Sequence, residues 1–179
     1  VLISTATVAL QEQLVHKDLP TLAAQMPQPF AFALAKGRGR YVCKLKLERL
    51  LSGVGEDDDV VPDDLLAAEA AEQRLVRRSV AAQGERAQFY ASLAQSLASS
   101  QWDGDRDQLP TPPEPELWAS VAADAHTCTN KHCPLFAQCS YFERRKELVA
   151  AQVIVANHDL LLSSLGARLL PELDNCLLV

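Results

Sequence analysis

The stretch Gln152-Val153-Ile154-Val155-Ala156 is a short, mostly apolar run that contains three β-branched residues in a row. Such a run predicts a strand that is buried on both faces, as in a parallel sheet. Residues 159–165 follow with a pattern that favours a helix, and residues 176–179 are another apolar run that predicts a last strand. This end of the chain is therefore predicted to form a strand–helix–strand unit.

The opposite end of the chain has a similar arrangement. Residues 1–5 predict a buried strand, Thr7 is placed to cap a following helix, and residues 30–34 predict a second strand. Alternating strands and helices indicate a parallel sheet with helical crossovers. We therefore expect an α/β fold in which residues 1–36 and 151–179 are parts of one sheet domain.

The residues between these ends, 37–150, differ in character. Two amphipathic, alanine-rich helices are expected over 65–82 and 86–99, with Gly84 as the break between them. Residues 103–116 contain four prolines and favour a loop. We expect residues 37–150 to form a mostly helical domain inserted into the sheet domain.

Composition limits the class of protein. The chain has 179 residues, 48% of them hydrophobic, with a formal net charge of −6, which argues against a generic basic protein that coats nucleic acid. Because the chain begins with Val1 and its only methionine is Met26, we expect an excised piece of a longer protein. No signal peptide is recognised, and the longest apolar stretch is interrupted by Gln152 and Asn157, so we expect no membrane span and a cytoplasmic protein.

Four of the five cysteines have spacings that suggest a metal site. Four residues separate Cys128 from Cys133, five separate Cys133 from Cys139, and Cys43 lies far upstream. Three thiolates on one loop and one distant thiolate suit an iron–sulfur cluster, in which each iron needs one external ligand. We expect Cys176, which lies among leucines, to pack in the core.

Zinc is the alternative metal for these cysteines. Structural zinc sites often use cysteines separated by two residues, and the gaps of four and five residues here are loose for that arrangement. His126 and His132 are nevertheless close enough in sequence to act as zinc ligands. The spacing favours iron–sulfur and leaves zinc open.

Positive charge is concentrated near the first of these cysteines. Between residues 36 and 49 there are six lysines and arginines and one glutamate, and six minus one leaves +5. Basic residues with interleaved aromatic rings suit single-stranded DNA, through phosphate attraction and base stacking. The alternative is a solvated surface with Tyr141 and Phe142 packed as core, and the acidic residues within 56–64 predict a solvated loop that would repel DNA.

Several motifs, taken in order, resemble those of the DinG-type helicases, bacterial relatives of the XPD-like iron–sulfur helicases. Residues 4–14 resemble the family's motif Ia, and residues 37–43 resemble the segment that leads to its first cluster cysteine. Residues 102–107 resemble a stretch within the family's insertion. Residues 153–162 resemble the strand and turn that return to the motor domain, and Cys128, Cys133 and Cys139 fall where the other three ligands belong.

The resemblance implies a partial RecA-like motor domain with an inserted iron–sulfur domain, in a monomeric helicase that unwinds DNA 5′ to 3′ with ATP. It implies a 4Fe–4S cluster on Cys43, Cys128, Cys133 and Cys139. The partners would be single-stranded DNA and duplex junctions. With the charge pattern, the resemblance predicts these DNA contacts: Thr5, Thr7, Gln11, Arg38, Arg40, Tyr41, Lys44, Lys46, Arg144 and Arg145.

The chain contains neither a phosphate-binding Gly-x-x-x-x-Gly-Lys-Ser/Thr motif nor an Asp-Glu-x-His motif. We therefore expect no catalytic residue here, no ATPase activity of the piece alone, and ATP and Mg²⁺ binding in the full-length protein only. The alternative function is a zinc-stabilised nucleic-acid-binding module without a motor. An electron-transfer protein is a third, weaker hypothesis, because such a carrier needs neither the helical insertion nor the basic surface.

Overall fold

A computed structural model describes residues 1–53, 69–167, 170 and 176–179. These residues form two compact units, and each is described by itself. Unit 1 is Val1–Arg40 with Asp124–Val179, and unit 2 is Tyr41–Ala123. The chain is thus of the α/β class, as predicted, with a parallel sheet in unit 1. Most of the predicted acidic loop and the start of the first helix expected in the insertion lie outside the described residues.

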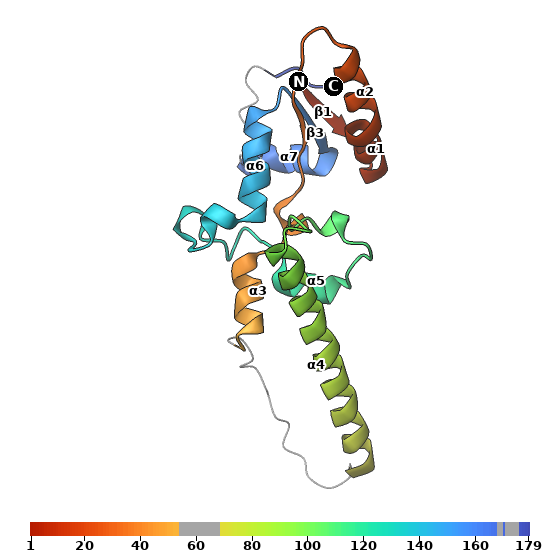
Figure 1. Ribbon diagram of the computed structural model, residues 1–179, viewed down its shortest axis with the longest axis vertical. Coiled ribbons are helices and arrows are strands. Elements are labelled where there is room, and N and C mark those ends of the chain that lie inside the picture. Colours follow the sequence, from red (N-terminus) through yellow and green to blue (C-terminus); the bar gives the residue numbers. More distant parts are fainter. Residues whose placement is uncertain (54–68, 168–169, 171–175) are drawn as a thin grey trace. The chain divides into compact units, whose positions relative to one another are not determined.

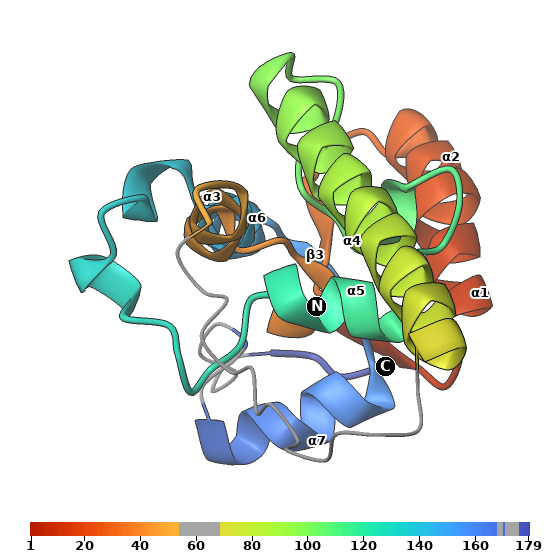
Figure 2. The same cartoon turned by 90° about the horizontal axis from the view of Figure 1, so that it is seen from below.

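Unit 2 is helical. Its elements are α3 (Lys44–Leu51), α4 (Glu69–Ala98), the 3₁₀ turn η3 (Arg106–Gln108) and α5 (Pro115–Val121). Figure 2 shows α4 as a long helix, with α3 viewed nearly along its axis. The core contains these buried residues: Val42, Leu47, Tyr90, Leu93, Trp102, Trp118 and Val121.

Helix α4 corrects the prediction of two helices separated at Gly84. The helix runs through Gly84 without a break, and nothing lies within 4 Å of where a Cβ would be. A glycine costs a helix only about 1 kcal/mol relative to alanine, and its neighbours here are strong helix formers. The packing of Tyr90, Leu93 and Leu97, at helical spacing, adds tertiary stabilisation.

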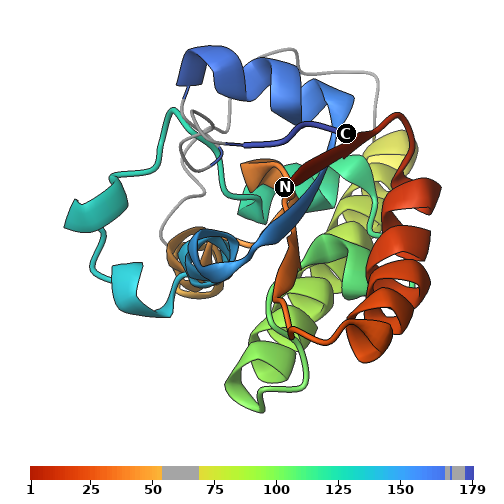
Figure 3. The same ribbon diagram turned by 90° about the horizontal axis from the view of Figure 1, so that it is seen from above.

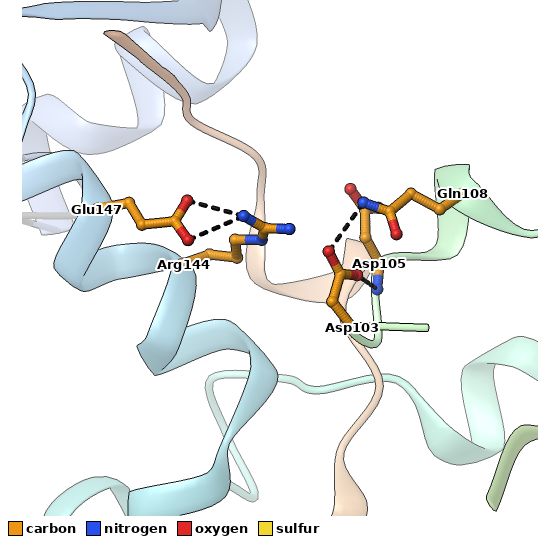
Figure 4. Close-up of polar contacts among 5 residues, drawn as sticks. All are labelled: Asp103, Asp105, Gln108, Arg144 and Glu147. Atoms are coloured by element: carbon orange, nitrogen blue, oxygen red, sulfur yellow. Dashed lines mark hydrogen bonds and ion pairs between the residues drawn. The ribbon is translucent and has the colours of Figure 1, made fainter. Parts of the chain in front are cut away.

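The proline-rich stretch 103–116 is also more ordered than a plain loop. Asp103 accepts hydrogen bonds from the Asp105 backbone N–H (2.9 Å) and from the Gln108 side-chain amide (2.8 Å), as Figure 4 shows. Gly104 has φ = +96°, which favours glycine, and its carbonyl accepts from the Val42 N–H (2.9 Å). Pro115 is the first residue of α5, a position that needs no amide hydrogen.

Unit 1 contains the sheet. Strands β1 (Leu2–Thr5), β3 (Val153–Asn157) and β2 (Phe32–Leu34) lie in the order β1-β3-β2, and both pairs are parallel. All three strands were predicted from their apolar runs. The predicted last strand appears only as a parallel bridge between Leu2 and Leu178, with hydrogen bonds such as Leu2 N–H to the Leu177 carbonyl (2.8 Å).

One helical run lies between β1 and β2 in the chain. It consists of α1 (Val8–Gln13), the π-turn η1 (Leu14–Asp18) and α2 (Leu19–Gln25). Thr7 is the N-cap, as predicted, and its hydroxyl accepts from the Leu10 N–H (3.2 Å). Pro20 has no N–H to continue the i→i−4 ladder, which accounts for the change of helical pitch just before it.

The two faces of the sheet are covered by different helices. Leu2, Ile154 and Ala33 are in register and belong to one core cluster, which also includes Leu148 of α6 (Ser140–Ala150). Residues of α7 (His158–Ala167) pack against the same cluster. Figure 3 shows α7 and the α1–α2 run on opposite sides of the strands. This two-sided cover fits the consecutive apolar residues Val153–Ala156 of β3, the central strand.

The unit boundaries differ from the predicted domain boundaries. The segment Asp124–Ala150 was expected within the insertion, but it belongs to unit 1, where α6 packs on the sheet through Leu148. The assignment of residues 37–150 as one inserted domain stays a prediction.

No helix in the described part of the chain is both long and apolar enough to cross a membrane.

Candidate cysteine-ligand site

Three of the four predicted ligands lie in unit 1 on successive tight turns. The 3₁₀ turn η4 (Asn130–His132) ends at Cys133, whose N–H donates to the Asn130 carbonyl (3.0 Å). The turn η5 (Phe136–Gln138) ends at Cys139, whose N–H donates to the Phe136 carbonyl (3.2 Å). The cysteine loop, defined here as Cys128–Cys139, is therefore fixed by its own backbone hydrogen bonds.

Asn130 organises the start of this loop. Its φ of +52° lies in the left-handed region, which asparagine tolerates better than most residues. The Asn130 N–H donates to the Cys128 sulfur (3.4 Å). Sulfurs that ligate metals commonly accept hydrogen bonds of this kind, which stabilise the negative charge on them.

Two of the predicted ligands are N-cap residues of helices. Cys139 precedes the 11-residue α6 in unit 1, and Cys43 precedes the eight-residue α3 in unit 2. Neither residue makes a side-chain capping hydrogen bond. The N-terminus of a helix favours negative charge, so both positions suit a thiolate bound to an anionic cluster.

Arg38 lies against the cysteine loop within unit 1. Its Cζ atom is 4.5 Å from the ring centroid of Tyr141 and 5.7 Å from that of Phe142. Its two terminal nitrogens approach the side-chain oxygen of Asn130 at 3.4 and 3.5 Å. The guanidinium therefore connects the glycine–arginine turn η2 (Arg38–Arg40) to the start of the cysteine loop and to the helix α6 (Ser140–Ala150) that follows it.

Two buried polar atoms beside the cysteine loop have no hydrogen-bond partner: Nε of Arg38 and Oγ of Ser140. They are the only such side-chain atoms found in the described part of the chain. A buried donor without an acceptor costs about 1–3 kcal/mol, so its persistence needs an explanation. Cysteine thiols outside disulfides, beside buried donors that lack an acceptor among the described residues, fit a group that carries sulfur acceptors, as an iron–sulfur cluster does.

The residues do not, however, form a ready metal-binding geometry. Over residues 1–53, 69–167, 170 and 176–179, no three histidine, cysteine, aspartate or glutamate side chains are grouped closely enough to hold one metal ion. Among the described residues no cysteine forms a disulfide, and all five are half-buried, while His126 and His132 are exposed. Joint ligation by Cys43, Cys128, Cys133 and Cys139 stays a prediction.

Two of the predicted DNA contacts near β1 make hydrogen bonds within unit 1. The Thr5 hydroxyl donates to the Thr7 carbonyl (3.2 Å), and the Thr7 hydroxyl caps α1. Thr5 is 4% exposed and Gln11 is 5% exposed. The roles of Thr5, Thr7 and Gln11 at DNA stay predictions, and the burial of Thr5 and Gln11 weighs against their direct contact in this conformation.

The predicted DNA contacts on α6 are also engaged within the helix. Arg144 pairs with Glu147, with 2.8 Å between Nη1 and Oε2, as Figure 4 shows. Arg145 donates to the Tyr141 hydroxyl (3.1 Å), and Lys146 pairs with Glu143 (2.6 Å). Part of the positive charge that the sequence places here is therefore neutralised by neighbouring glutamates.

The remaining predicted DNA contacts differ in accessibility. Arg40 is exposed at the end of unit 1, and Lys44 is half-buried at the start of α3. Lys46 donates to the Ala122 carbonyl (3.0 Å) within unit 2. Tyr41 is 3% exposed, which leaves little of its ring for base stacking. Arg40 and Lys44 are the members of this group best placed to contact DNA.

Ser140 was not singled out from the sequence. The signal available was its position directly after Cys139, but a serine at that position ordinarily marks a helix start. Only the burial of its hydroxyl without a partner distinguishes it.

Comparison with known proteins gives relatives along almost the whole chain. The protein named ATP-dependent DNA helicase DinG from Photobacterium profundum is 36% identical over 181 aligned positions, covering 99% of this chain and 24% of that protein. Those of the same name from Escherichia coli K12 and Salmonella typhimurium are each 34% identical, with 99% of this chain and 23% of the relative covered. No family model matches the chain. The chain spans about a quarter of the length of these relatives. The identity of 34–36% along 99% of the chain confirms the resemblance to a segment of DinG-type helicases.

Proposed function

From the premise that this chain corresponds to a segment of DinG-type proteins, we propose that it is the cluster-bearing segment of an ATP-dependent DNA helicase. The observation that carries the proposal is the 34–36% identity along 99% of the chain to proteins named as such helicases. This chain contains neither nucleotide motif. ATP and Mg²⁺ would therefore bind to other parts of the full-length protein. No relative named here supports a zinc module without a motor.

The proposed cofactor is a 4Fe–4S cluster held by Cys43, Cys128, Cys133 and Cys139. When bound, the cluster supplies a rigid cross-link among four thiolates. The positions of Cys43 and Cys128 differ by 128 − 43 = 85 residues, and a cross-link over so long a segment removes substantial loop entropy. The N-cap positions of Cys43 and Cys139 support this ligand set, since both favour negative charge.

The proposed substrate is single-stranded DNA and its junctions with duplex, in a monomeric cytoplasmic enzyme that moves 5′ to 3′. Exposed Arg40 in unit 1 and half-buried Lys44 in unit 2 would each attract phosphates. Arg38, Arg144 and Arg145 are half-buried, whereas Arg40 is exposed, so we assign them a weaker share of DNA binding than Arg40.

Metal analysis of the full-length protein, purified without air, tests the cofactor. We expect four irons and four sulfides per chain, with a brown chromophore in the visible spectrum. Stoichiometric zinc without sulfide would contradict the cluster and would favour the zinc-stabilised module.

Unwinding assays on the same preparation test the activity. We expect ATP-dependent strand separation on duplexes with a 5′ single-stranded tail, and none on duplexes with only a 3′ tail. Unwinding from the 3′ tail alone would refute the proposed polarity, and ATP-independent binding without unwinding would refute the motor.

A further inference from the structure

The hydroxyl of Ser140 is buried without a hydrogen-bond partner. The residue is 4% exposed, and its Oγ atom forms no hydrogen bond with the residues that the structure describes. Ser164, the other buried serine in the described residues, and Ser120, a helical serine, both satisfy their hydroxyls locally. Ser120 donates to the Glu116 carbonyl (3.2 Å), and Ser164 donates to the Leu161 carbonyl (2.6 Å). The Ser140 hydroxyl therefore differs from those of Ser120 and Ser164, which each donate to a backbone carbonyl.

The position of Ser140 explains part of this departure. It is the first residue of α6 and directly follows Cys139, so no helical turn precedes it. The Phe136 carbonyl, four residues earlier, accepts from the Cys139 N–H (3.2 Å). The rings of Phe136 and Phe142 lie 4.6 Å apart by centroid. The Ser140 hydroxyl itself is shielded from water, and burial strengthens any hydrogen bond formed there.

We propose that the Ser140 hydroxyl donates a hydrogen bond to a sulfur of the iron–sulfur group held by Cys139 and its fellow ligands. This inference rests on the proposed cofactor. The donor is a neighbour of a predicted ligand, is excluded from water, and has no partner among the described residues. Hydrogen bonds to cluster sulfurs stabilise the extra negative charge of the reduced state, so Ser140 raises the reduction potential of the cluster.

The test is spectroscopic reduction of the full-length protein, purified without air, with iron and sulfide measured for each variant. Ser140→Ala is expected to lower the midpoint potential at unchanged iron content. Ser140→Thr keeps a hydroxyl and is expected to stay near the unsubstituted protein, while Ser140→Val, of the same shape as threonine, is expected to fall with alanine. Ser163→Ala removes an exposed helical serine of unit 1 and is expected to change nothing.

Equal midpoint potentials for the Thr and Val variants would overturn the inference and leave the cluster proposal intact. Loss of iron from both Ala and Thr variants, with Ser163→Ala unaffected, would also overturn it, because the site would then depend on packing rather than on a hydroxyl. Zinc in the unsubstituted protein would overturn the proposed cofactor and this inference with it.

Discussion

The guanidinium of Arg38 lies over the ring of Tyr141, with 4.5 Å between the Arg38 Cζ atom and the ring centroid. The same guanidinium reaches the side-chain oxygen of Asn130 (3.4 Å). A charged group expected on the DNA-facing surface thus joins the glycine–arginine turn, the cysteine loop and α6 within unit 1. A partly buried cation over an aromatic ring is stabilising by about 1–2 kcal/mol.

Arg38→Ala is expected to loosen the cysteine loop of the full-length protein. Losing the contacts with Tyr141 and Asn130 should cost about 1–2 kcal/mol, which is a roughly 5- to 30-fold increase in local opening. Hydrogen–deuterium exchange of peptides within 126–145 measures this change. Lys131→Ala removes an exposed charge from the same loop and should leave exchange within about twofold. Equal exchange in the two variants would show that the contacts of Arg38 are not stabilising.

Cys133→Ser is expected to abolish iron binding and to expose the cysteine loop to protease. Serine is a poor substitute for a thiolate ligand, and the remaining three cysteines leave one iron without its external ligand. The measurements are iron content and limited proteolysis, with cleavage expected within 126–145 while the sheet strands stay protected. Cys176→Ser is the control, because Cys176 packs against the core of unit 1. Full iron in Cys133→Ser would remove it from the ligand set.

Arg40→Glu is expected to weaken single-stranded DNA binding by the full-length protein and to flatten its salt dependence. Each lost phosphate contact should lower the slope of log K against log salt by about 0.7. Binding titrations at several salt concentrations measure that slope. Arg86→Glu is the control, because it reverses an exposed charge on α4 that was not predicted to contact DNA. An unchanged slope in Arg40→Glu would assign Arg40 to the solvated surface.

Gly84→Ala is expected to stabilise α4 by about 0.5–1 kcal/mol, because an alanine there adds helix propensity and meets no atom within 4 Å. Gly53→Ala is the opposite case, since Gly53 has φ = +67° and alanine is strained there by about 1–2 kcal/mol. Hydrogen exchange of peptides covering residues 44–53 and 84–98 compares the two. Destabilisation by Gly84→Ala would indicate that the helix needs its glycine for a reason other than propensity.

Much of unit 1 could be predicted from local sequence. The runs rich in apolar and β-branched residues at Leu2–Thr5 and Val153–Asn157 form strands, because a strand covered on both faces favours such residues. Thr7 caps a helix as its side chain predicts. The parallel pairing followed from the alternation of strands and helices, since parallel neighbours require a crossover.

In unit 2, single helix-breaking residues were misleading as signs of where helices begin and end. Gly84 lies inside one continuous helix, because its cost is small beside the contributions of helix-forming neighbours and of Tyr90 and Leu93 in the core. Local breakers also hid α5, whose first residue is a proline that fits the first helical position. Single residues mark helix ends only where no tertiary packing outweighs them.

The sequence by itself determined the strands, the cap at Thr7 and the resemblance carried by the motifs and cysteines, because each is read from short stretches of the chain and their order. Tertiary structure alone decided which polar groups are free. Arg38 turned to Tyr141 and Asn130, about a hundred positions away, and Ser140 lost access to water without gaining an acceptor. Whether a charge or hydroxyl is available to a ligand depends on residues distant in sequence, and no local pattern records that.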